Sequence, residues 1–175
     1  MSAPQPSLSP EFAAGLREIM LTGLEREMET TKKVLGAVLD EKRDFRLDPK
    51  SRTAWELAWH IASTDVQMTD EVADRKFTME PRFKEEPKNI AEMVKWYDTN
   101  FKRAIGRVRA MTLEQLCTPV DFYGVFNMPA VFYLSCVNNH DIHHRGQLAA
   151  YLRPMGSKVP SIYGGSADEP WPGPQ

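Results

Sequence analysis

Residues 140–156 read HDIHHRGQLAAYLRPMG, and this stretch contains three of the four histidines in the chain. At about 100° per residue in an α-helix, His140 and His144 lie one turn apart on the same face, whereas His143 points away from them. The letters RPMG at its end include a proline and a glycine, which stop a helix. The stretch therefore predicts the end of a helix that presents two imidazoles at the margin of its buried face.

The rest of the chain repeats the helical pattern, so we predict an all-α four-helix bundle. Four long helices are expected over residues 12–39, 53–74, 90–108 and 129–152. A capping box, TAWE, opens the second, and Pro129 suits the first turn of the last. Residues 112–116 allow only a turn or two. Residues 117–127 are predicted to form a loop, with a strand-like kink as the alternative, because no alternating strand pattern is present. In the first helix the apolar positions are Phe12, Leu16, Ile19, Leu24, Met28, Leu35 and Leu39.

The fourth histidine, His60, lies in AWELAWHIAST at residues 54–64, at the edge of the apolar stripe of its own helix. Two imidazoles at positions i and i+4 are a common way for a helix to bind one metal ion. If the margins of the two helices meet, three imidazole nitrogens converge. The alternative is that these histidines are hydrogen-bonded packing residues beside the core, and the sequence leaves both readings open.

Composition excludes several classes of protein. The 175 residues fit one domain, with 42% hydrophobic and 26% charged residues. A formal charge of −2 and no run of Lys or Arg longer than two argue against a nucleic-acid partner. The apolar run MPAVFYLSCV is about half of the roughly 20 residues that a membrane span needs. MSAPQPSLSP is no signal peptide, and two distant cysteines form no disulfide framework, so we expect a cytoplasmic protein.

The stretch at 140–156, followed by VPSIYGGSADE at 159–169, resembles the carboxy-terminal signature of the DinB-like (DNA-damage-inducible) family. That family is grouped with the YfiT-like metal-dependent hydrolases. TAWELAWHIASTD at 53–65 resembles its second-helix signature. The resemblance implies a bundle of up-down-down-up topology and a divalent transition metal (zinc, nickel or iron) held by His60, His140 and His144. It also implies a homodimer. The characterised relatives are thiol-dependent transferases and isomerases, so the resemblance implies an activity of that kind.

The domain organisation follows from these assignments. Residues 1–10 are expected to be a flexible N-terminal segment, and residues 11–160 the DinB-like bundle. Residues 161–175 are rich in glycine and proline, so they predict an irregular tail packed on the bundle.

A metal held by three neutral imidazoles keeps an open coordination position, which is typical of catalytic sites. Such a site favours a hydrolase-like enzyme or a thiol-dependent transferase that acts on a small molecule, with a low-molecular-weight thiol as a possible cosubstrate. The alternative is a non-catalytic metal-binding helical dimer in stress response or metal handling. A third reading gives the histidines a structural role alone.

Four further residues are weaker candidates. Asp141 is a candidate for orienting a ligand imidazole, or else a helix-surface carboxylate. Glu56 is a candidate base, although its capping role already explains it. Cys136 either approaches the metal or packs as a small apolar residue. Trp55, predicted on the outer side of its helix, gives the dimer its support from the sequence.

Overall fold

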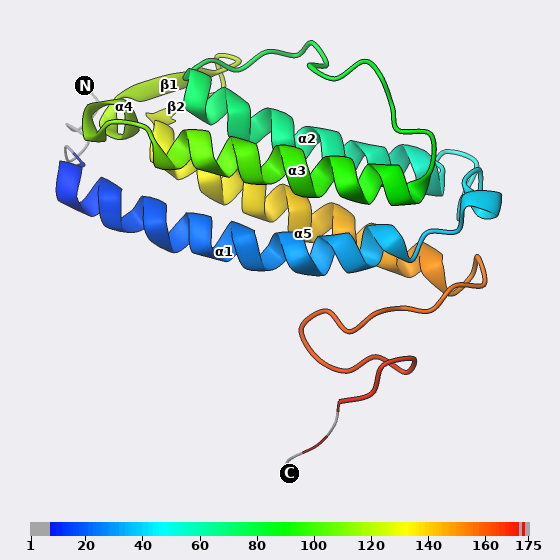
Figure 1. The fold of residues 1–175 in the computed structure, drawn as a ribbon. Coiled ribbons are helices and arrows are strands. Elements are labelled where there is room, and N and C mark those ends of the chain that lie inside the picture. Colours follow the sequence, from blue (N-terminus) through cyan, green and yellow to red (C-terminus); the bar gives the residue numbers. More distant parts are fainter. Residues whose placement is uncertain (1–7, 172, 174–175) are drawn as a thin grey trace.

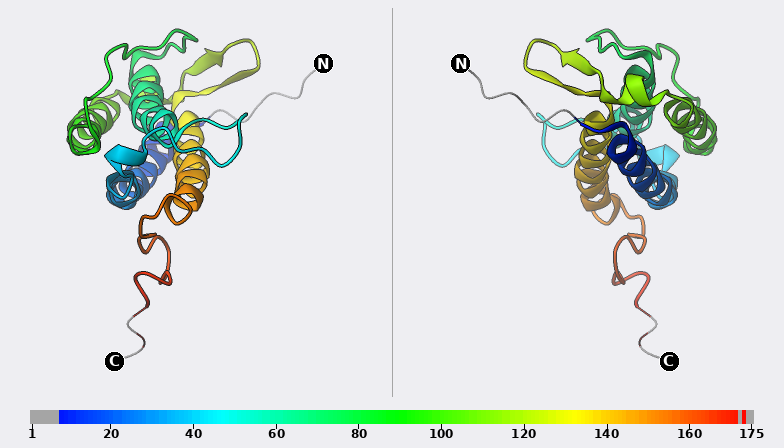
Figure 2. Two further views of the ribbon diagram at one scale, coloured as in Figure 1. Left: turned by 90° about the vertical axis from the view of Figure 1, so that its right-hand side faces the viewer. Right: turned by 90° about the vertical axis from the view of Figure 1, so that its left-hand side faces the viewer.

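The structure, a computed structural model, describes residues 8–171 and 173. Its fold is an all-α bundle of four long helices, as predicted. In Figure 1, α1 and α5 run in one direction and α2 and α3 in the opposite one, which is the up-down-down-up order. The end-on views of Figure 2 place the four helices at the corners of the bundle. Their bounds are Pro10–Gly36 (α1), Ala54–Asp74 (α2), Ile90–Arg109 (α3) and Tyr133–Leu152 (α5).

Each long helix packs against two neighbours. α2 contacts α3 and α5, and α1 contacts the same two helices, so α1 and α2 lie diagonally opposite. The parallel pair α2 and α3 needs a long crossover, which residues 75–89 supply along one side of the bundle (Figure 1). The two helices that contain the histidines, α2 and α5, are therefore antiparallel neighbours.

The capping box at the start of α2 is confirmed. The Thr53 hydroxyl accepts a hydrogen bond from the Glu56 amide at 3.1 Å, and the Glu56 carboxylate accepts one from the Thr53 amide at 2.7 Å. At the other end, Arg75 adopts the left-handed conformation (φ 56°) that stops the helix. Both ends of α2 are thus fixed by local contacts, which sets the position of His60 along the bundle.

The buried face of α1 differs from the predicted one. Leu24, Met28 and Leu35 are buried as expected, but Phe12 and Ile19 are 60% and 70% exposed. In the first half of α1 the buried stripe contains Ala13 and Leu21 instead, so Phe12 and Ile19 lie outside it. The buried residues of α1 are Ala13, Leu21, Leu24, Met28, Thr31, Val34 and Leu35.

The loop predicted at 117–127 is wrong, because this segment forms a β-hairpin. Strands β1 (Pro119–Phe122) and β2 (Phe126–Pro129) pair antiparallel, with Phe122 opposite Phe126. Tyr123 and Gly124 both have positive φ, 55° and 71°, which a tight hairpin turn requires. Four-residue strands are too short for an alternating pattern to be recognised, and a Tyr-Gly turn lacks the usual Asn-Gly or Asp-Gly signal.

Three short helical segments complete the chain between the long helices. The predicted turn or two at 112–116 is the helix α4, Leu113–Cys117, with its own capping box at Thr112. The last helix begins later than expected, because Pro129 ends β2 and a 3-10 turn, η2 (Ala130–Phe132), precedes Tyr133. The remaining 3-10 turn, η1 (Asp40–Lys42), follows α1.

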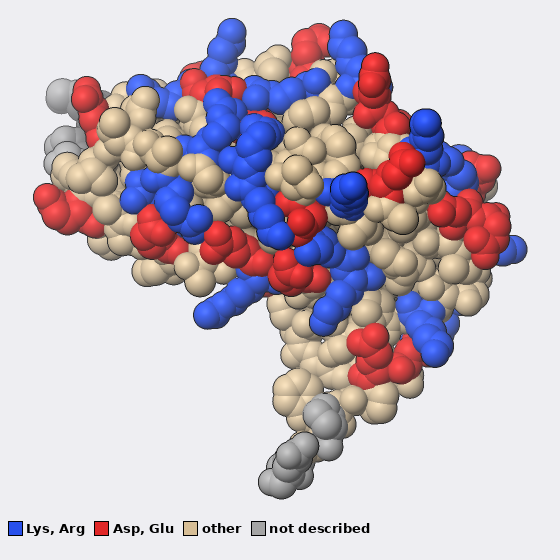
Figure 3. All heavy atoms as spheres, viewed as in Figure 1, with Lys and Arg blue, Asp and Glu red and all other residues tan. Residues whose placement is uncertain are grey.

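The surface formed by α1 and α3 has charges of both signs, interspersed with one another (Figure 3). Several of them pair between helices. Arg103 donates to Asp70 of α2 at 2.6 Å, and Arg109 donates to Glu25 of α1 at 3.0 Å. Among the described residues, no helix is both long and apolar enough to cross a membrane.

The segment after α5 is irregular, and its first part contacts the bundle. The Ser157 hydroxyl donates to the carbonyl of Ala37 at 2.6 Å, and the Tyr163 hydroxyl donates to Glu27 at 2.7 Å. Figure 1 shows the following residues projecting away from the helices. At the opposite terminus, α1 already begins at Pro10, and residues 1–7 of the predicted flexible segment lie outside the described residues.

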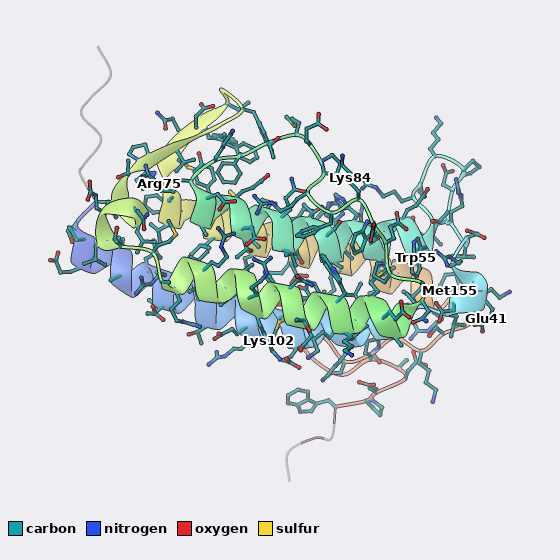
Figure 4. The ribbon with its side chains drawn as sticks, turned by 45° about the horizontal axis from the view of Figure 1, so that its top comes forward. Glu41, Trp55, Arg75, Lys84, Lys102 and Met155 are labelled. Carbon is teal, nitrogen blue, oxygen red and sulfur yellow. The ribbon has the colours of Figure 1, made fainter. Side chains whose placement is uncertain are left out.

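Trp55 is buried, so it does not have the exposed position that supported a dimer. Its side chain lies at the N-terminal end of α2, at the same end of the bundle as Met155 (Figure 4). The indole donates to Glu86 at 2.5 Å, and the guanidinium of Arg43 lies 3.7 Å above the ring. With these contacts the residue is 5% exposed, and the expectation of a homodimer rests on the family resemblance alone.

We expect Phe101→Ala to lower the free energy of unfolding by about 3–5 kcal/mol, because the ring is fully buried and its removal leaves a cavity. Ile19→Ala, on the exposed face of α1, should change it by about 0.5 kcal/mol or less. Urea denaturation followed by circular dichroism measures both. Equal losses for the two variants would contradict the assignment of the core.

Candidate metal centre

The structure brings His60, His140 and His144 together between α2 and α5. The Nε2 atom of His60 lies 3.2 Å from Nε2 of His140 and 3.2 Å from Nε2 of His144. All three nitrogens lie within 4.8 Å of one another, and each residue is partly buried. His143 is exposed and is not part of this cluster, as its position on the helix predicted, although its ring lies 4.7 Å from that of His144.

The opposite nitrogen of each ring faces a neighbouring side chain. Nδ1 of His140 lies 2.8 Å from a carboxylate oxygen of Asp65, and Nδ1 of His144 lies 2.7 Å from the amide oxygen of Gln147. Nδ1 of His60 lies 3.2 Å from the hydroxyl of Thr64. These contacts orient the rings so that all three Nε2 atoms point inward, an arrangement typical of metal-ligating histidines.

The rings are neutral at neutral pH. Burial lowers the pKa of His60 to about 3, and the positive charge of Arg52 contributes to this. Burial likewise lowers the pKa of His140 to about 4 and shifts that of His144 downward. Neutral imidazole is the form that binds a metal ion, so the cluster needs no deprotonation to act as a set of ligands.

The contacts among the Nε2 atoms fit a shared cation. With their Nδ1 protons donated to Asp65 and Gln147, His140 and His144 have lone pairs on Nε2. His60 has one Nε2 proton at most and donates it to one neighbour, so the other 3.2 Å contact joins two lone pairs. Tetrahedral zinc with bonds of about 2.0–2.1 Å holds its nitrogens roughly 3.3 Å apart, which is close to this spacing.

Beside the histidines lies a buried pair of carboxyl groups, Asp65 and Asp141. Burial raises the pKa of both, to about 8 for Asp141. Asp65 also accepts a hydrogen bond from the hydroxyl of Tyr97 at 3.1 Å. The prediction that Asp141 orients a ligand imidazole is wrong in position, because the carboxylate at His140 belongs to Asp65.

Asp141 instead connects the centre to α1 and to the tail. It is 1% exposed and accepts hydrogen bonds from Thr31 at 2.6 Å and from Arg145 at 3.1 Å. The guanidinium of Arg145, also buried, reaches Glu27 and the hydroxyl of Tyr163, each at 2.5 Å. A chain of buried polar contacts therefore crosses the bundle from a candidate ligand to the tail on the other side.

The other two weak candidates are not part of the cluster. Glu56 is exposed, and its carboxylate accepts the capping bond from Thr53, which also lowers its pKa. Cys136 is partly buried and packs against the core. Within residues 8–171 and 173, no Asp, Glu or Cys side chain joins the three histidines as a fourth ligand.

A hollow of about 510 Å³ adjoins the histidines, and His60 forms part of its wall. The hollow runs along α2 towards the hairpin and is covered by the crossover loop. Glu71 on its wall is almost fully buried, so its pKa is raised, and it accepts a hydrogen bond from Gln67. The remaining wall is mostly apolar and includes Trp59, Met68, Met79, Phe83, Phe122 and Tyr123.

Two of the supporting residues were not predicted, Asp65 and Gln147. A signal for Asp65 is present in the sequence, because it lies on the same stripe of α2 as Leu57, Ile61 and Val72. A charged residue on a core face is rare unless it is paired, so its position marks a buried contact. Gln147 gives no such signal, because it is an exposed polar residue on an ordinary helix.

Comparison with known proteins agrees with this architecture. The chain is similar to the uncharacterized protein YrdA of Bacillus subtilis (strain 168), with 26% identity over 157 residues that cover 85% of this chain and 89% of YrdA. A DinB-like protein from Bacillus cereus ATCC 10987 superposes with a TM-score of 0.71 at 28% identity, over 83% of this chain and 97% of that one.

A second solved structure, the DinB-like protein YjoA from Bacillus subtilis, shares the fold with a TM-score of 0.66 at 19% identity. That match covers 82% of this chain and 96% of YjoA. The sequence model that describes the DinB superfamily matches residues 24–148, well over half of the chain and both histidine-bearing helices. This protein is therefore a member of the DinB superfamily.

Proposed function

We propose that the protein is a metal-dependent enzyme that acts on a small molecule, either hydrolase-like or as a thiol-dependent transferase. The observation that supports this most directly is the inward convergence of three neutral imidazoles, with Nε2 of His60 3.2 Å from Nε2 of both His140 and His144. The ion is a divalent transition metal such as zinc, nickel or iron, because imidazole nitrogen suits each of them. His60, His140 and His144 hold it.

When bound, such a metal supplies a Lewis acid and lowers the pKa of a water or thiol that reaches its open position. The chain's own residues do the rest. Asp65 keeps the Nδ1 proton of His140, and Gln147 keeps that of His144, so both rings present a lone pair to the ion. The apolar wall beside His60 limits water around the reacting group.

The ligand assignment predicts a clear difference between neighbouring histidines. We expect His60→Ala and His144→Ala to abolish stoichiometric metal binding, whereas His143→Ala keeps it, because His143 is exposed and outside the cluster. Metal analysis of protein purified without a His tag measures this. Loss of metal in His143→Ala together with its retention in His144→Ala would contradict the assignment. All variants should stay helical, because the bundle has its own core.

The role of Asp65 predicts an effect on metal affinity. Asp65→Asn keeps the size of the side chain and replaces the carboxyl group beside Nδ1 of His140 with an amide, a weaker acceptor, so we expect affinity to fall about 10–100-fold. Asp98→Asn, on the surface beside Lys32, is the control and should bind metal as the wild type does. Competition with a chelator gives the affinities. An unchanged value for a folded Asp65→Asn variant would rule out the positioning role.

The open position separates an enzyme from a passive metal binder. We expect the absorption spectrum of the cobalt(II)-substituted protein to shift when 2-mercaptoethanol is added, because a thiolate can enter the fourth position. The shift should persist in Cys136→Ser, since that sulfur is outside the cluster. A spectrum that responds to no thiol or small anion would favour the alternative of a non-catalytic metal-binding protein.

A further inference from the structure

A second hollow, of about 450 Å³, lies between the start of α2 and the end of α5. It is formed by the segment before α2, the first turn of α2 and the last turns of α5. Its character differs from that of the hollow beside His60, because its wall contains two basic residues and no acidic one. The residues that matter here are Lys50, Ser51, Arg52, Leu57, Gln147 and Tyr151.

This hollow reaches the candidate metal ligands through their nearest neighbours. Gln147, on its wall, faces Nδ1 of His144 at 2.7 Å, and Leu57 lies one helical turn before His60. The hydroxyl of Tyr151 donates to the backbone carbonyl of Arg52 at 3.0 Å, which fixes the start of α2 against α5. A molecule in this hollow would therefore lie one side chain away from the histidine cluster.

The two basic side chains of the hollow are not engaged in ion pairs within the described residues. Within the described part of the chain, neither Lys50 nor Arg52 has a carboxylate within ion-pair distance, whereas Arg103, Arg107 and Arg145 are all paired. The backbone amides at the start of α2 are already used, since Ala54 and Trp55 donate to the carbonyls of Phe45 and Arg43. An anion in the hollow would thus be bound by side chains.

We propose that this hollow binds an oxyanion group of the substrate, a carboxylate or a phosphate, with Arg52 as its principal partner. A guanidinium donates two parallel hydrogen bonds to either group, and Lys50 and Ser51 are further donors on the same wall. This inference rests on the proposed function and deepens it, because it names the chemical class of the small molecule as an anion held beside the metal.

The hollow beside His60 supports this orientation of the substrate. Its wall contains Glu56 and Glu71, no lysine or arginine, and a large apolar surface. An anionic group is disfavoured there by charge, whereas an apolar group gains contact area. The two hollows therefore favour a substrate with its oxyanion towards Arg52 and its apolar part towards the hairpin.

The test is a titration of the zinc-loaded protein with inorganic phosphate and, in parallel, with acetate, followed by amide chemical shifts in NMR. We expect shifts at the start of α2 and the end of α5, and an affinity for the preferred anion that falls about tenfold or more in Arg52→Gln. Arg46→Gln is the matched control, because Arg46 is exposed in the same segment and does not line the hollow. Equal affinities in the two variants would overturn the proposal.

The same titration without metal separates this inference from the proposed function. Zinc content is measured for each variant, and Arg52→Gln should keep its zinc. In His60→Ala, which is expected to bind no stoichiometric metal, the anion should still shift the same amide signals. Adding Arg52→Gln to this variant should still weaken the binding of the anion. Failure of the wild-type chain to bind zinc would contradict the proposed function alone. An absence of anion-dependent shifts at the hollow, with zinc bound, would overturn the subsite alone.

Discussion

The contact between α2 and α5 is the constraint on which the rest of the site depends. Each helix alone offers imidazole at the margin of its apolar face, and only their antiparallel packing places Nε2 of His60 3.2 Å from both partners on α5. The capping box at Thr53 sets where α2 begins, and the bond from Tyr151 to the carbonyl of Arg52 ties that start to α5. A shift of one helical turn, about 5.4 Å, would separate the three nitrogens.

The same contact requires polar groups inside the bundle. Asp65 and Asp141 are buried side by side, and burial of carboxyl groups is costly unless they are protonated or paired. The hydroxyls of Thr31 and Tyr97 and the guanidinium of Arg145 meet these requirements. An apolar core of the same volume would stabilise the bundle at least as well. The network is explained by its end point, the Nδ1 atom of His140, which it holds in one orientation.

The two hollows differ in the character of their walls. One is lined by the segment before α2 and the end of α5, and the other by α2, the crossover and the hairpin, with His60 on its wall. The crossover and the hairpin cover the apolar side, and residues 47–52 form the basic side. Such loops are free to vary while the bundle stays the same, which is how one fold can carry different binding surfaces.

Periodicity along the chain was sufficient to predict the four helices, and the pair at His140 and His144 was sufficient to predict two ligands on one face. These are local properties, since a period near 3.6 and a spacing of four residues follow from helical geometry alone. The sequence placed His60 at a comparable margin, but only the tertiary structure decided that the two margins meet. It also decided which carboxylate lies at His140. In the sequence both Asp65 and Asp141 stand next to a position on the histidine-bearing face of their helix, and the partners of each come from other helices. The burial of Trp55 was decided in the same way, by its contact with Glu86 of the crossover. The hairpin at 119–129 is a local pairing, and its strands are too short for the sequence pattern to reveal.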